Sequence, residues 1–386
     1  MSSEPDKPFV SFYSQHNISP VAQDISDLSR HFGRRRNLYH KLGLAPFAFY
    51  GKNILECGPG SGYNSLYVLN QKPAFYHLVD GNPIGLAETE KRLTEAVVPG
   101  VELKFDLSLF EDFKSNIKYD LVLGEGFLAF QTDPAGLAGH LADFVTPGGV
   151  FVGTCADSVS FLSDMIRRLL AQANADQLLP VTRRAEVLAP YFEPHFKNLP
   201  GMSRPIVDWL LDNALQPFYG KFFSLEEAVV ALENDFVVFQ SSPSFATDWR
   251  WYKDMVDPDL DYNQMFKDQY RQNIHNFIDY TVFFEPRRPD ENIELLNLCD
   301  ALYNTTLLYQ DRPSPDLLLK AAEQIQAVAA NLKPLGVKAA GTIEALQDGA
   351  EALRRTARSS GFPDCGRFAS FFGRGQQYVS FVRCGG

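Results

Sequence analysis

The feature that most constrains the fold of this chain is a regular alternation of short apolar runs and helical segments between residues 53 and 155. The apolar runs are "NILEC", "FYHLVD", "VELKF", "YDLVLGEGFL" and "VFVGTC". Helical segments are expected between most of them, each bounded by proline, glycine or a capping residue. Strands that alternate with helices at such short intervals form a parallel sheet with helices on both faces. The sequence therefore predicts an α/β fold.

Three glycines follow the first expected strand directly, in "NILECGPGSGYNSLY". They are Gly58, Gly60 and Gly62, and Glu56 precedes them. A strand-to-helix turn needs such backbone freedom, and so does a loop that approaches a ligand closely. A dinucleotide fingerprint would need a further glycine at Tyr63, and the GK[ST] of a P-loop is absent. The spacing is GxGxG, preceded by an acid.

These residues resemble the class I S-adenosylmethionine (SAM)-dependent methyltransferases. The first motif of that family, an acid, a spacer and GxGxG, stands here as "ECGPGSG". An acid that closes the second strand corresponds to Asp80 in "HLVDGNP", and an acid after the third strand corresponds to Asp106 in "LKFDLS". "TPGG" before the fifth strand is also typical of the family. The resemblance covers residues 45–157 and 340–386, and it implies a Rossmann-like, mostly parallel seven-stranded sheet.

The resemblance also implies SAM as the cofactor and S-adenosylhomocysteine as the product. Glu56 would act near the amino acid end of SAM, Asp80 would accept both ribose hydroxyls, and Asp106 would accept the adenine amino group. For each acid the alternative is a helix cap or a surface charge, and Glu111 and Asp112 compete with Asp106. The full expected cofactor-binding set is Tyr13, Glu56, Gly58, Gly60, Gly62, Asp80, Gly81, Asp106, Leu107 and Gly124.

Two residues are candidates for the chemical step. Methyl transfer is an in-line displacement, so a base is needed only when the acceptor atom carries a proton. Glu125 lies between Gly124 and Gly126 at the end of the fourth expected strand, where it would face the methyl group and orient the acceptor or take its proton. His16 in "FYSQHNISP" is the alternative base, because imidazole titrates near neutrality. The competing interpretations are a solvent-exposed loop acid and a loop histidine without a role in the site.

The chain is expected to have three parts. Residues 1–50 would form a helical N-terminal cap or lid, residues 51–157 and 340–386 the SAM-binding core, and residues 158–339 a large, mainly helical insert over the substrate. The basic run "RHFGRRRNLYHK" in the first part is predicted to be a solvated helix face, with contact to a phosphate or carboxylate as the alternative.

The C-terminal segment "RFASFFGRGQQYVSFVRC" is expected to complete the sheet with two antiparallel strands. The helix "AEALRRTARSSGF" before it supports this placement. The alternative uses "FVVFQ" (residues 236–240) as a strand of the sheet and leaves the C-terminus peripheral. "YTVFF" (residues 280–284) is a further candidate strand.

Composition narrows the function classes. The chain of 386 residues has 36 Lys and Arg against 47 Asp and Glu, a formal charge of −11, which argues against binding of nucleic acid through its phosphates. The Asn/Asp-Pro-Pro-aromatic tetrapeptide of nucleic-acid methyltransferases is also missing after the fourth strand. No apolar run approaches the roughly 18 residues of a membrane span, and the polar N-terminal stretch "MSSEPDKPFV" lacks the apolar core of a signal peptide. Five scattered cysteines form no CxxC pair. A cytoplasmic location without membrane contact is expected.

No metal is expected. Asp257, Asp259 and Asp261 alternate as at the start of a calcium loop, but Tyr262 stands where that loop requires glycine. The predicted function is therefore methyl transfer from SAM to a small polar acceptor, such as a metabolite, a saccharide or a natural-product intermediate. The alternatives are a protein methyltransferase and a SAM-binding protein with other chemistry or no turnover. The sequence leaves the oligomeric state open.

Overall fold

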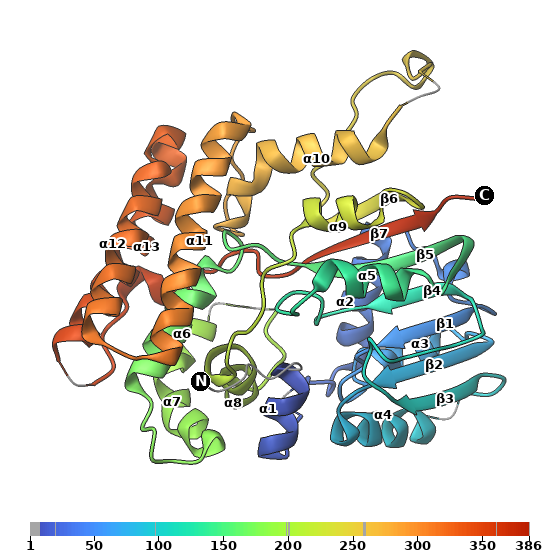
Figure 1. Ribbon diagram of the computed structural model, residues 1–386, viewed down its shortest axis with the longest axis horizontal. Coiled ribbons are helices and arrows are strands. Elements are labelled where there is room, and N and C mark those ends of the chain that lie inside the picture. Colours follow the sequence, from blue (N-terminus) through green and yellow to red (C-terminus); the bar gives the residue numbers. More distant parts are fainter. Residues whose placement is uncertain are drawn as a thin grey trace. The chain divides into compact units, whose positions relative to one another are not determined.

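The computed structural model describes residues 8–19, 21–96, 98–197, 199, 201–257, 260–359 and 361–385. Their contacts divide the chain into two compact units (Figure 1). We call one the sheet unit; it comprises the described parts of Ile25–Ala156, Gly220–Tyr270 and Gln376–Gly386. We call the other the helical unit; it comprises the described parts of Met1–Asp24, Asp157–Tyr219 and Arg271–Gly375.

The sheet unit contains one seven-stranded sheet with the strand order β3-β2-β1-β4-β5-β7-β6. The strands are β1 (Asn53–Cys57), β2 (Phe75–Asp80), β3 (Glu102–Leu107), β4 (Tyr119–Gly124), β5 (Val145–Cys155), β6 (Phe236–Ser242) and β7 (Gln377–Arg383). β1 to β5 pair in parallel, and β7 is antiparallel to both of its neighbours, β5 and β6. The predicted Rossmann-like, mostly parallel seven-stranded sheet is confirmed.

The apolar runs became strands because the middle of the sheet is buried on both faces. β1, β2 and β4 are almost entirely buried, whereas the edge strand β3 alternates between exposed and half-buried residues. Strands buried on both faces show nearly continuous apolar sequence, and an edge strand does not need it. The parallel register brings the carboxyl ends of β1, β2 and β4 to one edge of the sheet.

Helices flank the sheet, and several begin where local signals predicted. Asn82 caps the helix after β2 through the N–H of Ile84, with Pro83 in the first turn, and Asp133 caps the helix after β4 in the same way, followed by Pro134. The helical elements of the sheet unit are α2 (Leu28–Lys41), η1 (Pro46–Ala48), α3 (Ser65–Asn70), α4 (Pro83–Glu95), α5 (Pro134–Ala142), α9 (Leu225–Leu232), η3 (Tyr252–Asp254) and α10 (Tyr262–Asn273), whose last residues cross into the other unit.

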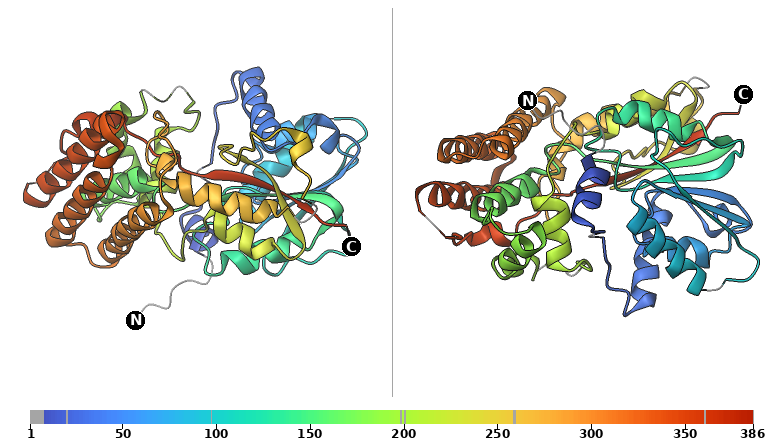
Figure 2. Two further views of the ribbon diagram at one scale, coloured as in Figure 1. Left: turned by 90° about the horizontal axis from the view of Figure 1, so that it is seen from above. Right: turned by 60° about the horizontal axis from the view of Figure 1, so that its bottom comes forward.

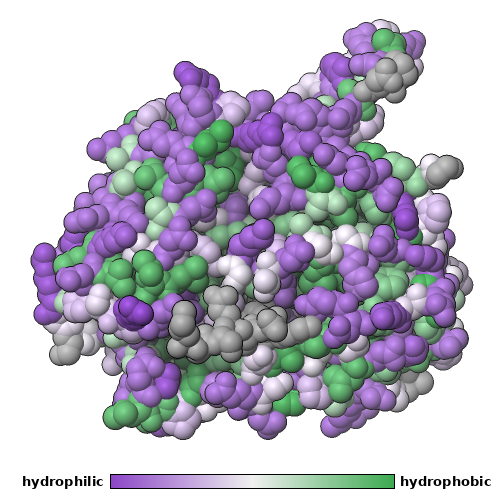
Figure 3. All heavy atoms as spheres, in the orientation of Figure 1, coloured by the Kyte–Doolittle hydropathy of each residue, from purple (hydrophilic) through white to green (hydrophobic). Residues whose placement is uncertain are grey.

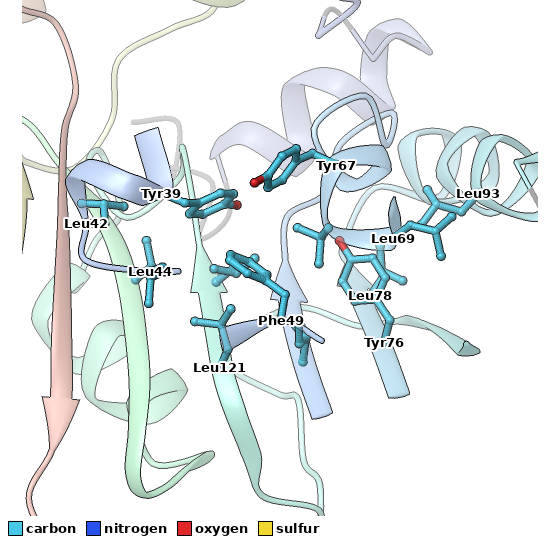
Figure 4. Packing of buried hydrophobic residues seen from close by; sticks show 14 residues of the cluster. Tyr39, Leu42, Leu44, Phe49, Tyr67, Leu69, Tyr76, Leu78, Leu93 and Leu121 are labelled. Atoms are coloured by element: carbon cyan, nitrogen blue, oxygen red, sulfur yellow. The ribbon is translucent and has the colours of Figure 1, made fainter. Parts of the chain in front are cut away.

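One hydrophobic cluster packs α2 and the segment after it against the sheet (Figure 4). Tyr39 of α2 stacks on Tyr67 of α3 with 5.6 Å between ring centroids, and its ring lies 5.0 Å from that of Phe49. Leu78 of β2 and Leu121 of β4 contribute to the cluster from the sheet. This packing holds α2 beside the carboxyl ends of the strands.

The C-terminal segment differs from the expectation. "GRFAS" forms a short 3₁₀-helix, η6 (Gly366–Ser370), and only "QYVSFVR" becomes a strand, β7. The partner of β7 is β6, from "FVVFQ", so that run is a strand of the sheet, as the alternative placement had it (Figure 1). The peripheral C-terminus of that alternative is wrong, because β7 pairs with both β5 and β6, and the expectation that the last residues join the sheet holds for this one strand. The carbonyls of Phe368, Ala369 and Phe371 converge on the buried guanidinium of Arg167 instead of pairing with a strand. The candidate strand "YTVFF" is irregular.

The helical unit consists of packed helices. The long ones α11, α12 and α13 lie side by side (Figures 1 and 2). Its helical elements are α1 (Pro8–His16), α6 (Leu162–Asn174), α7 (Val181–Phe196), α8 (Ile206–Trp209), the π-helical η2 (Leu210–Leu215), η4 (Ile274–Phe277), α11 (Pro289–Asp311), α12 (Pro315–Asn331), η5 (Lys333–Ala339), α13 (Ala340–Arg358) and η6. α13, expected ahead of the last strands of the sheet, packs on α12. The two helices of the expected N-terminal cap, α1 and α2, fall in different units, and residues 1–7 lie outside the described part.

The face drawn in Figure 3 carries mostly hydrophilic residues, with hydrophobic ones scattered among them. Within the described ranges, none of the helices combines the length and the apolar character needed to span a bilayer.

Candidate functional site

The glycine loop after β1 adopts a conformation that only glycine accepts readily. Gly58, Gly60 and Gly62 have φ values of 71°, 58° and 75°. A Cβ atom at Gly58 would lie 2.9 Å from the ring of Phe127, and one at Gly62 would lie 3.0 Å from the Cα of Thr89. Both the left-handed backbone and the close packing therefore require these glycines.

Asp80, the last residue of β2, is tied to this loop. Its carboxylate accepts hydrogen bonds from the backbone N–H of Gly60 (3.1 Å) and of Asn82 (2.8 Å), and its side chain is buried. Thr89 holds the other side of the loop by donating to the carbonyl of Gly60 (2.7 Å). Burial raises the pKa of Asp80 to about 6, although bonds from the N–H groups of Asn82, Gly60 and Gly81 act against that rise. A carboxylate has about four acceptor sites, so these three donors leave one for a further donor such as a hydroxyl.

Glu56, next to last in β1, is also buried at this edge. It accepts a hydrogen bond from the hydroxyl of Tyr76. The pKa of Glu56 is raised to about 7, mainly by burial. The hydrogen bond from Tyr76 acts to lower this pKa, and the charge of Glu125 acts to raise it. A cationic ligand near Glu56 would favour its ionised form. The site thus holds two acids, Glu56 and Asp80, whose ionisation depends on what binds beside them.

Glu125, directly after β4, is held by two side chains of α2. Nη2 of Arg35 donates to both carboxylate oxygens of Glu125, at 2.9 and 2.6 Å, and the Tyr39 hydroxyl donates to one of them at 2.8 Å. The Arg35 and Glu125 side chains are only 8% and 13% exposed. Burial of Arg35 acts to lower its pKa, but the charge of Glu125 outweighs this and the pKa of Arg35 lies above its ordinary value. Glu125 is therefore part of a buried ion pair.

The sequence interpretation missed Arg35 and Tyr39. The basic run on α2 was expected to be a solvated face, and the alternative, contact with a carboxylate, is correct for Arg35. Residues four apart lie on the same face of a helix, so the spacing of Arg35 and Tyr39 in an otherwise basic segment was the available signal.

Asp106, on β3, is part of a second polar network. Its Oδ2 atom accepts from Nε2 of His77 and from Nζ of Lys104, both at 2.8 Å, and Nδ1 of His77 accepts from the Tyr119 hydroxyl at 2.6 Å. Partial burial acts to raise the pKa of Asp106, but the bonds from Lys104 and His77 outweigh it, so the pKa lies below its usual range. Oδ2 of Asp106 thus has two donors, the buried, neutral imidazole of His77 and the partly exposed ammonium of Lys104.

The neighbours of Asp106 are more exposed. Leu107 is 60% exposed, and Glu111 and Asp112, the competing acids, are also exposed. Gly124 ends β4 directly before Glu125 and pairs with Cys57 of β1. Because β2 and β4 both pair with β1 in parallel, Gly124 lies at the same edge of the sheet as the glycine loop and Asp80. Gly81 directly follows Asp80 there.

Tyr13 and His16 lie on α1 in the helical unit, whereas the other candidate residues belong to the sheet unit. The Tyr13 hydroxyl donates to Asp212, and the His16 ring lies 4.8 Å from the Phe12 ring. Burial, followed by the charge of Arg184, lowers the pKa of His16. The assignment of Tyr13 to the cofactor and of His16 to catalysis stays a prediction.

The segment considered for calcium is only partly described. Asp259 lies outside the described residues, and Tyr262 begins α10. In the part of the chain that the structure describes, no three His, Cys, Asp or Glu side chains group in a way that could hold a metal ion.

Comparison with known proteins gives the following similarities. No family model matches the chain. A trans-aconitate 2-methyltransferase from Acidovorax sp. (strain JS42) is 26% identical over 186 residues, which cover 43% of this chain and 69% of the relative. The N-methyltransferase NodS from Bradyrhizobium japonicum WM9, in complex with S-adenosyl-L-homocysteine, is 15% identical with a TM-score of 0.32, covering 39% of this chain and 75% of that one. A putative sarcosine dimethylglycine methyltransferase from Galdieria sulphuraria is 10% identical with a TM-score of 0.37, covering 92% and 85%.

Proposed function

We propose that this chain, a SAM-dependent methyltransferase with the class I fold, transfers a methyl group from SAM to a carboxylate oxygen of a small organic acid. The premise rests on the strand order, the glycine loop after β1, the acids on β2 and β3, and the similarity to a curated methyltransferase. The acceptor is the new part. The observation that carries it is the pairing of both Glu125 oxygens with Arg35 and Tyr39.

The residues at the carboxyl ends of β1 and β2 fit SAM. The cofactor supplies an electrophilic methyl group on a cationic sulfonium. Asp80 would accept from the ribose hydroxyls, because its carboxylate is held in place by backbone N–H groups and retains an acceptor site. Glu56 would bind near the cationic amino acid end, which would favour its ionised form. Gly58, Gly60 and Gly62 give the loop its left-handed backbone, and the cofactor would lie against that loop.

Asp106 and Leu107 would bind the adenine end of SAM. Asp106 is held by His77 and Lys104 through Oδ2, so the other oxygen can accept the adenine amino group. Leu107 next to it would lie against the base, which would cover its exposed side chain.

The Glu125 pairing favours an acceptor that carries no proton. A general base needs a lone pair directed at the proton it removes. Arg35 and Tyr39 already donate three hydrogen bonds to the carboxylate of Glu125, and breaking them would leave a buried guanidinium unpaired. An ionised carboxylate acceptor avoids this cost, because its oxygen attacks the methyl group with no proton to remove. Glu125 then orients the acceptor side of the site through its ion pair.

The curated relative supports the same acceptor class. The acceptor in its name, trans-aconitate, is a small organic acid with several carboxylates. Its similarity covers less than half of this chain, so we extend only the class of acceptor and not the compound.

The experiment compares turnover on acids with turnover on their neutral derivatives. Release of S-adenosylhomocysteine would be measured with small di- and tricarboxylic acids, with the matching amides, and with a peptide substrate. We expect turnover on at least one acid and none on its amide. Turnover on peptides alone would favour a protein methyltransferase, and SAM binding without turnover on any acceptor would contradict the proposal.

The Glu125→Gln variant tests the role of this residue at saturating SAM. If no base is needed, kcat should fall by less than about tenfold, whereas loss of a general base would cost roughly 10²- to 10⁴-fold. His16→Ala applies the same test to the alternative base. Glu95→Gln, which changes an exposed acid at the last residue of α4 in the same unit, is the control and should leave kcat unchanged.

A further inference from the structure

His77, in β2, is a polar side chain inside the sheet, and only 1% of it is exposed. Burying an imidazole costs free energy unless its ring nitrogens have hydrogen-bond partners. Both nitrogens of His77 have one: Nε2 lies 2.8 Å from Oδ2 of Asp106, and Nδ1 lies 2.6 Å from the Tyr119 hydroxyl. His77 therefore connects a buried side chain of β4 to an acid of β3 that is proposed to face the cofactor.

The register of the sheet explains why His77 reaches Asp106. Side chains two residues apart in a strand point to the same face of the sheet, so His77 and Val79 share a face. Val79 is the register partner of Asp106 in the parallel pair of β2 and β3, which places Asp106 on that face too. The rings of Phe113 and Phe75 pack against the imidazole, with centroids 5.4 and 5.8 Å from its own. Register and packing thus hold the imidazole with Nε2 toward Asp106.

The hydrogen bonds of His77 run in one direction, toward Asp106. Burial lowers the pKa of His77, so the ring is neutral at neutral pH and carries one N–H. An ionised carboxylate only accepts, so this N–H is at Nε2, and Nδ1 accepts from the Tyr119 hydroxyl. The Tyr119 oxygen can in turn accept from the Ser115 hydroxyl, 3.1 Å away. Ser115, Tyr119 and His77 thus form a chain of donors that ends on one oxygen of the acid, and successive bonds in such a chain strengthen one another.

The bonds to Asp106 leave one of its oxygens for a ligand. Nζ of Lys104 donates to Oδ2 at 2.8 Å, the same oxygen that His77 contacts, and among the described residues no hydrogen bond reaches Oδ1. The Asp106 side chain is 35% exposed, in contrast to that of His77, so solvent or a ligand has access to it. A carboxylate that is held through one oxygen does not turn freely, and its second oxygen therefore keeps a fixed direction.

We propose that His77 is a positioning residue that makes the site selective for adenine: it holds Oδ2 of Asp106, so that Oδ1 is aimed at the exocyclic amino group of the purine. This rests on the proposed function, in which Asp106 accepts from that amino group, and extends it to a side chain that is itself buried. An acceptor with a fixed direction favours a donor in one place and rejects another acceptor there. The selectivity for adenine thus depends on the hydrogen-bond chain behind Asp106.

The test compares two ligands that differ in the purine alone. S-adenosylhomocysteine carries an amino donor at C6, and S-inosylhomocysteine carries a carbonyl acceptor there. Calorimetry on the full chain gives both dissociation constants, and the wild type should prefer S-adenosylhomocysteine by roughly 10- to 100-fold. His77→Leu should reduce this preference by about three- to tenfold, mainly by weakening the binding of S-adenosylhomocysteine. His77→Gln, whose amide N–H can replace Nε2–H, should keep the preference within about twofold of the wild type.

The ratio of the two constants separates a positioning role from a structural one. Damage to the sheet would weaken both ligands alike, so an unchanged preference in His77→Leu would overturn the proposal. The matched control is Asn263→Leu, which removes a buried side chain that bonds to β6 at the opposite edge of the sheet. It should lower the unfolding midpoint and leave the preference within about twofold.

Asp106→Ala tests the proposed function itself. If the preference is lost in Asp106→Ala but unchanged in His77→Leu, the role of His77 is refuted and the adenine assignment of Asp106 stands. If the preference is unchanged in Asp106→Ala, both are refuted.

A measurement on the unmodified protein covers the case in which His77→Leu does not fold. With ¹⁵N-labelled histidine, the His77 ring should show a protonated Nε2 and an unprotonated Nδ1 at neutral pH, with its signals assigned by their loss in His77→Gln. The Nε2–H resonance should move more on addition of S-adenosylhomocysteine than on addition of S-inosylhomocysteine. A proton on Nδ1, or an Nε2–H resonance that the two ligands move equally or not at all, would overturn the proposal.

Discussion

Lowering the pH from about 8 to about 5 should weaken SAM binding, and Asp80 should account for about a tenfold loss. Burial places the pKa of Asp80 at about 6 in the protein without ligand. Ribose hydroxyls donate hydrogen bonds to a carboxylate, so they favour its ionised form, and the pKa in the SAM complex should lie lower. SAM therefore binds best when Asp80 is already ionised, which is the case above about pH 6.

The magnitude follows from the fraction of Asp80 that is ionised. One pH unit below a pKa of about 6, roughly one molecule in ten carries the charge, so the affinity falls about tenfold there. It continues to fall until the pH reaches the lower pKa of the complex. Glu56 adds a second loss that begins at higher pH, because its pKa is about 7 and its ionised form favours the cationic ligand.

Calorimetric titration of SAM at a series of pH values measures this profile. Asp80→Asn should abolish the part of the pH dependence of SAM affinity that lies near pH 6. It should also lower the affinity at every pH by roughly 10- to 100-fold, because the remaining hydrogen bonds are weaker. Glu56→Gln should lose the component near pH 7 and keep that of Asp80. Asp120→Asn is the control, because Asp120 accepts from the backbone N–H of Asn53 (2.9 Å) at the other end of the strands and should keep the wild-type profile.

The reasoning would be refuted by a wild-type affinity that is constant over this pH range. It would also be refuted if Asp80→Asn retained the full wild-type pH dependence, since the titrating group would then lie elsewhere.

Two further predictions concern stability. Gly58→Ala should lower the free energy of unfolding by about 1–3 kcal/mol, because residue 58 has a positive φ and the new Cβ would meet the ring of Phe127. Gly33→Ala should raise the free energy of unfolding by up to about 1 kcal/mol, because Gly33 lies inside α2 with open space around it. Urea unfolding of both variants checks the pair, and equal effects would contradict the backbone argument. Deleting residues 377–386 should abolish cooperative unfolding, because β7 pairs with both β5 and β6. A truncated chain that still unfolded cooperatively and bound SAM would show that β7 is dispensable.

Much of the sheet unit could be predicted from the sequence because its signals are local. β1, β2 and β4 are buried on both faces and therefore read as apolar runs. The glycines after β1 and the caps Asn82 and Asp133 act within a few residues of where they stand. Asp80 could be placed for the same reason, since a strand end is enough to locate it.

The tertiary structure decided the features that depend on which distant segments meet. β7 pairs with β6, and nothing in "FVVFQ" or "QYVSFVR" names the other as its partner. Arg35 meets Glu125 across 90 positions, so a run that looks like a solvated helix face became half of a buried ion pair. The sequence thus determined the parallel strands, the glycine loop and the places of Glu56 and Asp80 at the strand ends. Packing alone decided the long-range partners, because hydrophobic burial is non-directional and any complementary segment can satisfy it.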